Sequence, residues 1–416
     1  MTKPPSLPPL LGLAFPPNGI GAHDLPSIVA LQQAIDADIA PRAADNDAAG
    51  RYPTASIAAL KRSGILKIAV PRDYGGDPAP HRVSLEAQVR LAAADSAVAQ
   101  IFKIHDELLR EIFVYSPEEL RPTLARVVLE DDAIIGLAVA ESGKTVLEPM
   151  QTTATPRAGG GFTLNGRKIY TTGAAEADYI AVWGFNRDAP GVADNKLLGM
   201  QLNLVARGSA GVTIHRDWDA LGQRATDSGA ITFENVVTDP GLRASVPGKS
   251  LIHASLRYQA GFAANMIGTA IGALRAAIPF VNTQSRPWPS AAVENAADDP
   301  NVRRLAGELT ADLAAAYAIT LATGDLLDAF ERGEIGRTAL AAPIYAAKSV
   351  ATRAALRATS EIFSLMGTRA AARTNGFDRF WRNVRTLSLH DPVEWKHTEL
   401  GRHVLTGWDP PPGLYQ

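Results

Sequence analysis

Apolar residues change their spacing twice along this 416-residue chain, and this change constrains the fold more than any other feature. From about residue 25 to 132 they recur every three or four positions, which predicts helices. From 133 to 240 they alternate or run together with β-branched and aromatic residues, which predicts strands. Helical spacing then returns and continues to the C-terminus. We therefore predict a mainly α-helical protein with an N-terminal helical domain and extended arm (1–132), a central β-barrel or β-sandwich domain (133–240) and a C-terminal helical bundle (241–416).

Three segments of the central region have strand character, namely residues 161–170, 179–184 and 197–207. Asn165-Gly166 lies in the first of them. This dipeptide favours the positive φ angles of a two-residue turn between antiparallel strands. The sequence therefore predicts a β-hairpin at this point.

Two alanine-rich stretches, residues 302–331 and 338–365, predict long helices that pack closely in a bundle. The longest uncharged run, residues 258–274, contains Gln259 and Asn265. These polar residues predict a buried helix and not a membrane span.

Composition excludes several classes of function. The formal net charge is −2, and acidic and basic residues are interspersed, so we expect neither nucleic acid nor a membrane as a partner. The chain has no cysteine, which excludes disulfides, thiolate metal sites and cysteine nucleophiles. The sequence contains no HExxH or similar spacing of histidines and acidic residues, so it does not predict a metal site. The first residues lack an apolar signal core, so we expect a cytoplasmic protein.

The stretch GFDRFWRNVRTLSLHDPVEWK, residues 376–396, begins with the apolar spacing of an amphipathic helix. Pro392 disfavours helical geometry at Asp391, so the helix should end at about His390. The carbonyl end of a helix favours a protonated imidazole. A histidine and a carboxylate are therefore expected side by side where a helix breaks. Alternatively, His390 caps the helix and Asp391 starts a turn, without any chemistry.

The pattern FDRFWRN-x-R-T-x-S-L-H-D-P-V resembles the C-terminal signature of flavin-dependent monooxygenases built on the acyl-CoA dehydrogenase fold, among them the sulfur-acquisition oxidoreductases. The N-terminal order of helix, Ser-Gly, short apolar run, Pro-x-x-Tyr-Gly-Gly, helix and Ala-Asp-Ser is also similar to that superfamily. The resemblance implies its three-domain fold and a tetramer of paired dimers.

RKIYTTG, residues 167–173, resembles the family motif that lies against the flavin ring. The resemblance implies that Tyr170, Thr171 and Thr172 contact flavin. Alternatively, these residues only fill the end of a strand. In AIIGLAVAES, residues 133–142, the chain resembles the strand and loop that approach the flavin.

Two further segments resemble the elements that serve the flavin phosphate. In Ser285-Arg-Pro-Trp, Arg286 takes the place of an arginine that reaches the phosphate across a subunit interface. In Gly367-Thr-Arg, Arg369 matches a phosphate arginine of the monooxygenase branch. A fixed charge and forked N–H donors suit a phosphate. In addition, DALGQRATDSG, residues 219–229, resembles a loop near the mouth of the active site, where we expect a structural role for Gly222.

Two histidines are candidates for catalysis. His390 is the stronger one, because an imidazole with an ordinary pKa of about 6.5 donates and recovers a proton at neutral pH. His105, in QIFKIHDELLR, lies where the monooxygenase branch carries a substrate-pocket histidine. Without the resemblance, His105 reads as a structural residue. Thr172 and His105 are expected to assist His390.

The resemblance implies a two-component monooxygenase. A separate NAD(P)H:flavin reductase supplies FMNH2, and O2 forms a C4a-hydroperoxide that oxygenates a small organic substrate, expected to be an organosulfur compound. The alternative is an FAD-dependent acyl-CoA dehydrogenase or nitroalkane-type oxidase with Asp391 as the base. Aspartate is one methylene shorter than the usual glutamate, and a misplacement of about 1 Å costs on the order of a hundredfold in rate.

Overall fold

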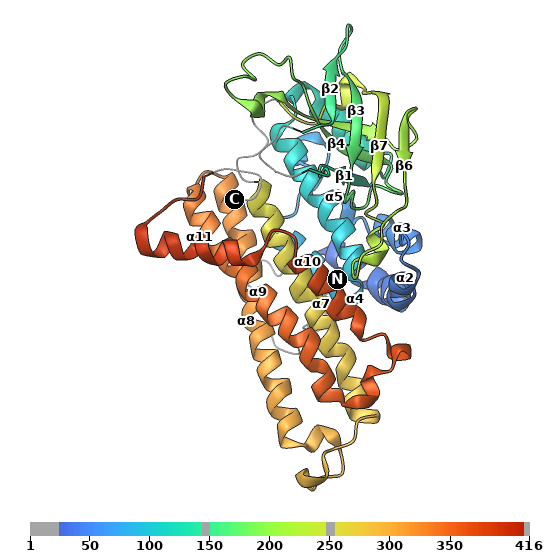
Figure 1. Cartoon of the computed structure of the whole chain (residues 1–416), viewed down its shortest axis with the longest axis vertical. Helices are drawn as coiled ribbons and strands as arrows, with labels where there is room; N and C mark the ends of the chain where they lie inside the picture. Colours follow the sequence, from blue (N-terminus) through green and yellow to red (C-terminus); the bar gives the residue numbers. More distant parts are fainter. Residues whose placement is uncertain (1–24, 144–149, 247–253, 412–416) are drawn as a thin grey trace, which may run out of the picture.

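Figure 1 shows a β domain at one end of an elongated molecule and a bundle of long helices at the other. The computed structural model describes residues 25–143, 150–246 and 254–411. The arm expected over residues 1–24 lies outside the described residues. The helices of the N-terminal region lie between and beside the other two parts.

The N-terminal region is helical, as the apolar spacing predicts. Its α-helices are α1 (Pro26–Ala34), α2 (Ala43–Ala49), α3 (Thr54–Ser63), α4 (His81–Ala94), α5 (Ser96–Tyr115) and α6 (Arg121–Leu129).

Helix α5 connects the three parts of the molecule. Its N-terminus is capped by the Asp95 carboxylate, which accepts from the N–H groups of Ala97 and Val98. Nearly every residue of α5 is buried, because the helix packs against α4, β1 and the first helix of the bundle. Side chains on α5 therefore meet residues of both other regions.

Within the described residues, seven strands form one sheet with the order β1-β4-β2-β3-β7-β6, and β5 pairs antiparallel with β4. The strands are β1 (Ile135–Ala138), β2 (Thr153–Pro156), β3 (Phe162–Lys168), β4 (Tyr179–Phe185), β5 (Met200–Ala206), β6 (Val212–Ile214) and β7 (Ile231–Val237).

The hairpin predicted at Asn165-Gly166 is wrong. Both residues lie inside β3, which pairs with β2 on one side and with β7 on the other. The register against β7 shifts between Leu164 and Gly166, as at a β-bulge. A Cβ on Gly166 would lie 2.4 Å from Thr152 Oγ1, so the glycine serves a close approach and not a turn.

The bundle contains α7 (Ala254–Thr283), α8 (Pro300–Glu331), α9 (Arg337–Met366), α10 (Asp378–Ser388) and α11 (Val393–Thr406).

The two long helices predicted from the alanine-rich stretches are confirmed as α8 and α9. By length and composition alone, Ser255–Thr283 and Pro300–Glu331 are apolar enough to cross a membrane. Their apolar windows are 78% and 50% buried in the molecule, as in core helices of a bundle. The domain boundaries after residues 132 and 240 stay predictions.

Candidate active site

His390 lies just beyond the end of α10, where the sequence predicts a break. Its ring packs on Phe262 of α7, with ring centroids 4.3 Å apart and an interplanar angle of 33°. His390 is exposed, and no described residue hydrogen-bonds to its ring nitrogens. Both nitrogens are therefore available to a bound molecule.

The pKa of His390 is lowered to about 3, first by burial and then by the positive charges of Lys103 and Lys348. Protein thus surrounds the imidazole closely while part of the residue stays accessible to solvent. The expectation of a protonated imidazole is wrong. Lys348 Nζ donates to the carbonyls of His390 (3.1 Å) and Asp391 (2.9 Å), so an ammonium group already occupies this carbonyl end.

Asp391 turns its carboxylate into the protein. Its φ is 55°, and its side chain is only 5% exposed. Asp391 Oδ2 lies 3.4 Å from Lys396 Nζ and 3.9 Å from Lys348 Nζ, and it accepts from the Gln259 amide. The carboxylate is the counterion of two buried ammonium groups, which does not fit a base that must reach a substrate.

His105 is fully buried, and the protein backbone uses both of its ring nitrogens. Nδ1 accepts from the Ile135 N–H at 3.0 Å, and Nε2 lies 2.8 Å from the Leu66 carbonyl. The ring is therefore a neutral imidazole with its proton on Nε2. In this geometry His105 ties α5 to β1 and to the turn after α3. The catalytic contact expected for it stays a prediction.

The residues expected at the flavin ring follow β3 in a turn. Tyr170 has a φ of 54° and is 64% exposed, and its ring lies edge-on to Trp218 at 5.9 Å. Thr171 is buried, and its hydroxyl donates to the Gly229 carbonyl at 2.6 Å. Thr172 is half-buried and accepts from Ser228 Oγ at 3.0 Å. Tyr170 and Thr172 are thus accessible, whereas the Thr171 hydroxyl is used within the domain.

Helix α5 brings this turn and His390 into one neighbourhood. Gly173 has a φ of 73°, and a Cβ there would lie 3.3 Å from Ile101 of α5. Two residues further along α5, Lys103 Nζ lies 4.0 Å from the centroid of the Phe262 ring, on which His390 packs. The Thr172 turn and Phe262 therefore meet α5 at about the same level along its axis, although Ile101 and Lys103 point to different sides of the helix.

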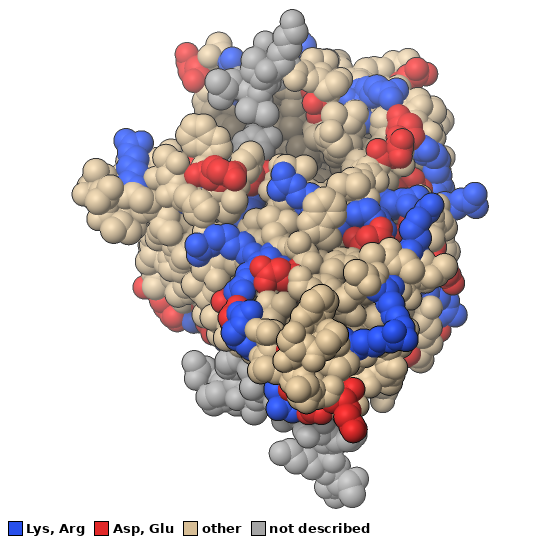
Figure 2. Space-filling view, turned by 60° about the horizontal axis from the view of Figure 1, so that its bottom comes forward, with Lys and Arg blue, Asp and Glu red and all other residues tan. Residues whose placement is uncertain are grey.

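Arg286 and Arg369 are both exposed, and they lie in loops that are tied together. Arg369 Nη1 donates to the Gln284 carbonyl at 3.1 Å, and Ser285 Oγ donates to the Met366 carbonyl at 2.8 Å. The ends of α7 and α9 thus bring the two predicted phosphate arginines to one end of the bundle. That end comes forward in Figure 2, where basic and acidic side chains are scattered over a mostly uncharged surface.

The arginines and His390 lie at different ends of α7. Thr283, where α7 ends, comes 21 residues after Phe262 (283 − 262), which corresponds to about 32 Å along the helix. This is longer than the distance from ring to phosphate in FMN. Within one chain, therefore, the arginines and the Thr172–His390 region do not meet at the same flavin.

The two halves nevertheless fit the two ends of a flavin mononucleotide. Two exposed guanidinium groups on adjacent loops suit a phosphate. An exposed tyrosine ring and the Thr172 hydroxyl suit a flat ring with polar edges.

A cluster of three side chains of the kinds that bind metal ions occurs elsewhere in the described part of the chain. His81, Asp328 and Glu331 place their ligand atoms within 4.8 Å of one another. Asp328 accepts from the His81 N–H at the start of α4, and Arg257 Nη2 lies 3.2 Å from Glu331 Oε1. Because Glu331 already pairs with Arg257 and with His81 Nε2, the cluster forms a polar contact between α4, α7 and α8.

Residues that the sequence interpretation missed surround His390. Lys103 is buried and pairs with Glu107 at 2.7 Å, and Lys348 is fully buried under the end of α10. Their sequence signal was a lysine within an apolar helical stretch. A lysine of this kind is buried only with partners. The partner of Lys103 lies four residues along α5, whereas the groups that accept from Lys348 belong to distant residues, namely Gln259, His390 and Asp391.

Three stretches of the chain match domains of one family. They match the descriptions "Acyl-CoA dehydrogenase, N-terminal domain" over residues 29–128, "middle domain" over 136–236 and "C-terminal domain" over 260–395.

Among curated proteins, the chain is 35% identical over 393 residues to a dibenzothiophene monooxygenase of Rhodococcus qingshengii, covering 89% of this chain and 91% of that protein. It is 30% identical over 398 residues to the probable FMNH2-dependent monooxygenase SfnC of Pseudomonas putida, covering 93% and 97%. Among solved structures, FMN-bound TdsC from Paenibacillus sp. A11-2 superposes with a TM-score of 0.87 at 31% identity, covering 94% of this chain and all of that one. The chain therefore belongs to the acyl-CoA dehydrogenase family and, within it, to the flavin-dependent monooxygenases.

Proposed function

We propose that the chain is the oxygenase component of a two-component system, which uses FMNH2 and O2 to oxygenate a small organosulfur compound. The observation that carries the proposal is the His390 imidazole, which is accessible and free of described partners on a wall built from α5, α7 and α10. The names of the relatives support FMN as the cofactor and a sulfur compound as the substrate.

Reduced FMN, when bound, would supply the two electrons that activate O2, and O2 would supply the oxygen atom that is transferred. His390 is neutral at pH 7 because of its lowered pKa, so it presents one N–H donor and one nitrogen acceptor. We assign it to hold the reacting oxygen by a hydrogen bond from its neutral imidazole. Leu389, which precedes His390 in the chain and is 61% exposed, offers an apolar surface next to the imidazole, which favours an apolar substrate.

Assembly follows from the separation of the two halves of the site. We propose that Arg286 and Arg369 of one chain bind the phosphate of an FMN whose ring lies against Tyr170 and Thr172 of another. The resemblance to the family points to a homotetramer of paired dimers. We also propose a separate NAD(P)H:flavin reductase and a cytoplasmic location.

The alternative reaction, dehydrogenation with Asp391 as the base, has less support. The carboxylate is buried and held by Lys396, Lys348 and Gln259. A proton abstracted from a substrate requires a base within hydrogen-bond reach of it. Asp391 in this position supports the end of α10 and the orientation of His390.

His390→Ala and Asp391→Asn made in parallel test the proposal. If His390 is catalytic, His390→Ala leaves FMNH2 binding nearly intact and lowers product formation by about 10² to 10⁴. Stopped-flow mixing of the FMNH2-loaded protein with oxygenated buffer, with a panel of thioethers, sulfones and amines, measures both steps. Anaerobic bleaching of tightly bound FAD by an acyl-CoA, abolished by Asp391→Asn, would overturn the proposal in favour of the dehydrogenase.

A further inference from the structure

Three hydroxyl groups form a chain that ends at Thr172. Thr226 Oγ1 lies 2.7 Å from Ser228 Oγ, and Ser228 Oγ donates to Thr172 Oγ1 over 3.0 Å. Thr226 and Ser228 are 1% and 3% exposed, whereas Thr172 is half-buried. The three hydroxyl groups therefore lead from the buried interior of the β domain to the partly exposed residue Thr172.

Each hydroxyl group has one proton, so it can donate one hydrogen bond. This limit decides which hydroxyl donates and which accepts. Ser228 donates its proton to Thr172 and so accepts from Thr226, whose single proton is shared between Ser228 Oγ and the Gln223 carbonyl oxygen 2.8 Å away. The Gln223 carbonyl does not depend on the Thr226 hydroxyl, because it also accepts from Trp218 Nε1–H at 2.9 Å and from the Thr226 N–H at 3.1 Å. Thr172 accepts from Ser228, so its own proton stays available for a hydrogen bond to a group other than these three hydroxyls.

The loop that carries Thr226 and Ser228 is fixed to both helices beside His390. The Gln223 N–H donates to Asn383 Oδ1 at 2.5 Å, and Gln223 Nε2 donates to Ser96 Oγ at 2.7 Å. Ser96 is the first residue of α5, and Asn383 lies on α10, seven residues before His390 (390 − 383).

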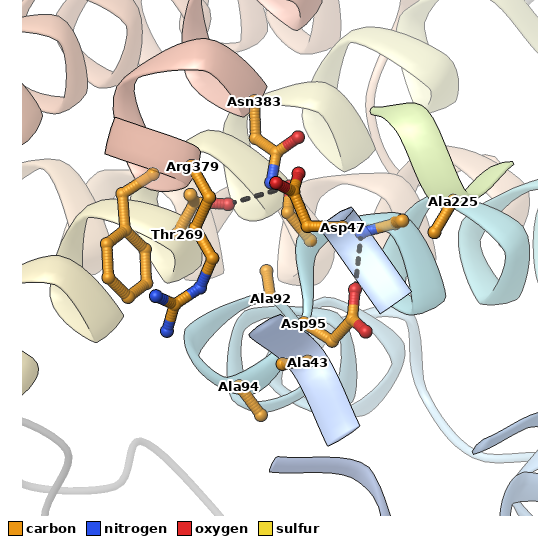
Figure 3. Close-up of a pocket in the computed structure, with 12 residues that line it drawn as sticks. Ala43, Asp47, Ala92, Ala94, Asp95, Ala225, Thr269, Arg379 and Asn383 are labelled. Carbon is orange, nitrogen blue, oxygen red and sulfur yellow. Dashed lines mark hydrogen bonds between the residues drawn. The ribbon is translucent and has the colours of Figure 1, made fainter. Parts of the chain in front are cut away.

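A small cavity marks this junction. Figure 3 shows Asn383 on one side of it, with Asp47, Asp95 and Arg379 around it. Its volume is about 10 Å³, room for about one water molecule and far too little for a flavin. The junction therefore acts as a support for the loop and not as a binding site.

We propose that Ser228 is a positioning residue, which orients the Thr172 hydroxyl as a hydrogen-bond donor toward bound FMN. The inference rests on the proposed function, because it takes FMN as the group that faces Thr172. Ser228 acts only through Thr172, and the anchors at Asn383 and Ser96 hold this donor in the same frame as His390.

A double-mutant cycle with Ser228→Ala and Thr172→Val tests the inference, with oxidised FMN as the probe. One net hydrogen bond corresponds to a Kd increase of about 2- to 10-fold, which we expect for Ser228→Ala in the wild-type background. In the Thr172→Val background we expect no further change in Kd. Ser228→Ala and Thr172→Val should also shift the visible absorption band of bound FMN in the same direction, because both remove the same donor.

Thr238→Val is the matched control. Thr238 is a buried residue of the same domain whose hydroxyl accepts from the Phe162 N–H at 2.8 Å, without a link to Thr172. It should leave Kd and spectrum unchanged, which separates positioning from a general loss of stability. If Ser228→Ala does not fold, Thr226→Val replaces it in the cycle with the same expected coupling to Thr172.

Additive effects of the two substitutions would overturn the inference, and so would a Ser228→Ala protein that binds FMN with wild-type Kd and spectrum. Either result leaves the proposed function standing. Failure of the wild-type chain to bind FMN would instead overturn the proposed function and this inference together.

Discussion

Burial, and after it two buried lysines, lower the pKa of His390 and keep its imidazole neutral. Lys103 and Lys348 approach the Phe262 ring, with Nζ 4.0 Å and 5.5 Å from its centroid, and His390 packs on the same ring. A third positive charge on the imidazole would be repelled by both ammonium groups. The residue that the sequence predicts as a proton donor with an ordinary pKa is therefore a neutral hydrogen-bonding group.

We expect the imidazole of His390 to stay neutral from pH 8 down to about pH 5, because its pKa is lowered from the ordinary value of about 6.5 to about 3. Nuclear magnetic resonance of imidazole-labelled protein, with the signal assigned by His390→Phe, measures this titration. The corresponding acid limb of the rate profile should not show a transition near pH 6.5 from this residue. A midpoint between pH 6 and 7 for the assigned signal would contradict the electrostatic account.

The loop of residues 219–229 depends on a close contact with α10. A Cβ on Gly222 would lie 2.1 Å from the Arg382 carbonyl oxygen, so Gly222→Ala must push the loop away from the helix. We expect a loss of about 1–3 kcal/mol in the free energy of unfolding, together with weaker FMN binding. Denaturant unfolding and flavin titration measure the two effects.

Gly208→Ala is the control for this substitution, because nothing lies within 4 Å of the position that its Cβ would take. Its effect on stability should stay within about 0.5 kcal/mol, with no effect on FMN binding. Equal effects of the two alanines would show that the loop does not depend on the contact with α10.

Helix α5 also carries a buried carboxyl group with a raised pKa, that of Glu111. Burial raises the pKa of Glu111 to about 7, although Tyr258 donates a hydrogen bond to it. The folded pKa lies above the unfolded value, so this group stabilises the fold at low pH. That contribution is lost as the pH rises from about 4.5 to 7.

Glu111→Gln removes this titration, because the glutamine oxygen still accepts from Tyr258 without becoming charged. We expect the stability of the variant relative to wild type to increase between pH 5 and pH 8, by on the order of 3 kcal/mol. Unfolding curves at both pH values, with the exposed Glu119→Gln as control, give the difference. A difference that is the same at both pH values would refute the assignment.

At the scale of elements, the sequence predicts what depends on local spacing. The three-region order, the long helices α8 and α9 and the end of α10 before Pro392 follow from apolar periodicity and proline sterics. Asn165-Gly166 is a turn signal only when the flanking strands pair with each other, and here β3 pairs with β2 and β7 instead.

The candidate site could be predicted only in part, for the same reason. His390, Thr172 and the two arginines came from motifs. The satisfied state of His105 depends on Leu66 and Ile135, which lie 39 and 30 residues away. The Gln223–Ser96 contact joins residues 127 apart, and no local pattern carries that information.

At the scale of the whole molecule, one chain carries both proposed halves of a flavin site, but they lie far apart along α7. Arg286 and Arg369 lie beyond the end of α7, about 32 Å along that helix from Phe262, where His390 packs. If FMN spans two chains, each complete site takes the arginines from one chain and the Thr172–His390 region from its neighbour. A substitution in one half of a chain then disables the site to which that half contributes. The other half of the same chain still contributes to the neighbouring site.

Mixing two inactive variants tests this arrangement. Arg286→Ala and His390→Ala homo-oligomers should each show little monooxygenase activity. After joint refolding or coexpression, a mixed dimer has one site with both defects and one intact site, so random pairing restores about a quarter of the sites. The recovered product rate, with each variant alone and a mixture of differently tagged His390→Ala chains as controls, measures this fraction. No recovery from oligomers that are shown to be mixed would mean that each FMN is bound by one chain, and the arginines would then need a role other than phosphate binding.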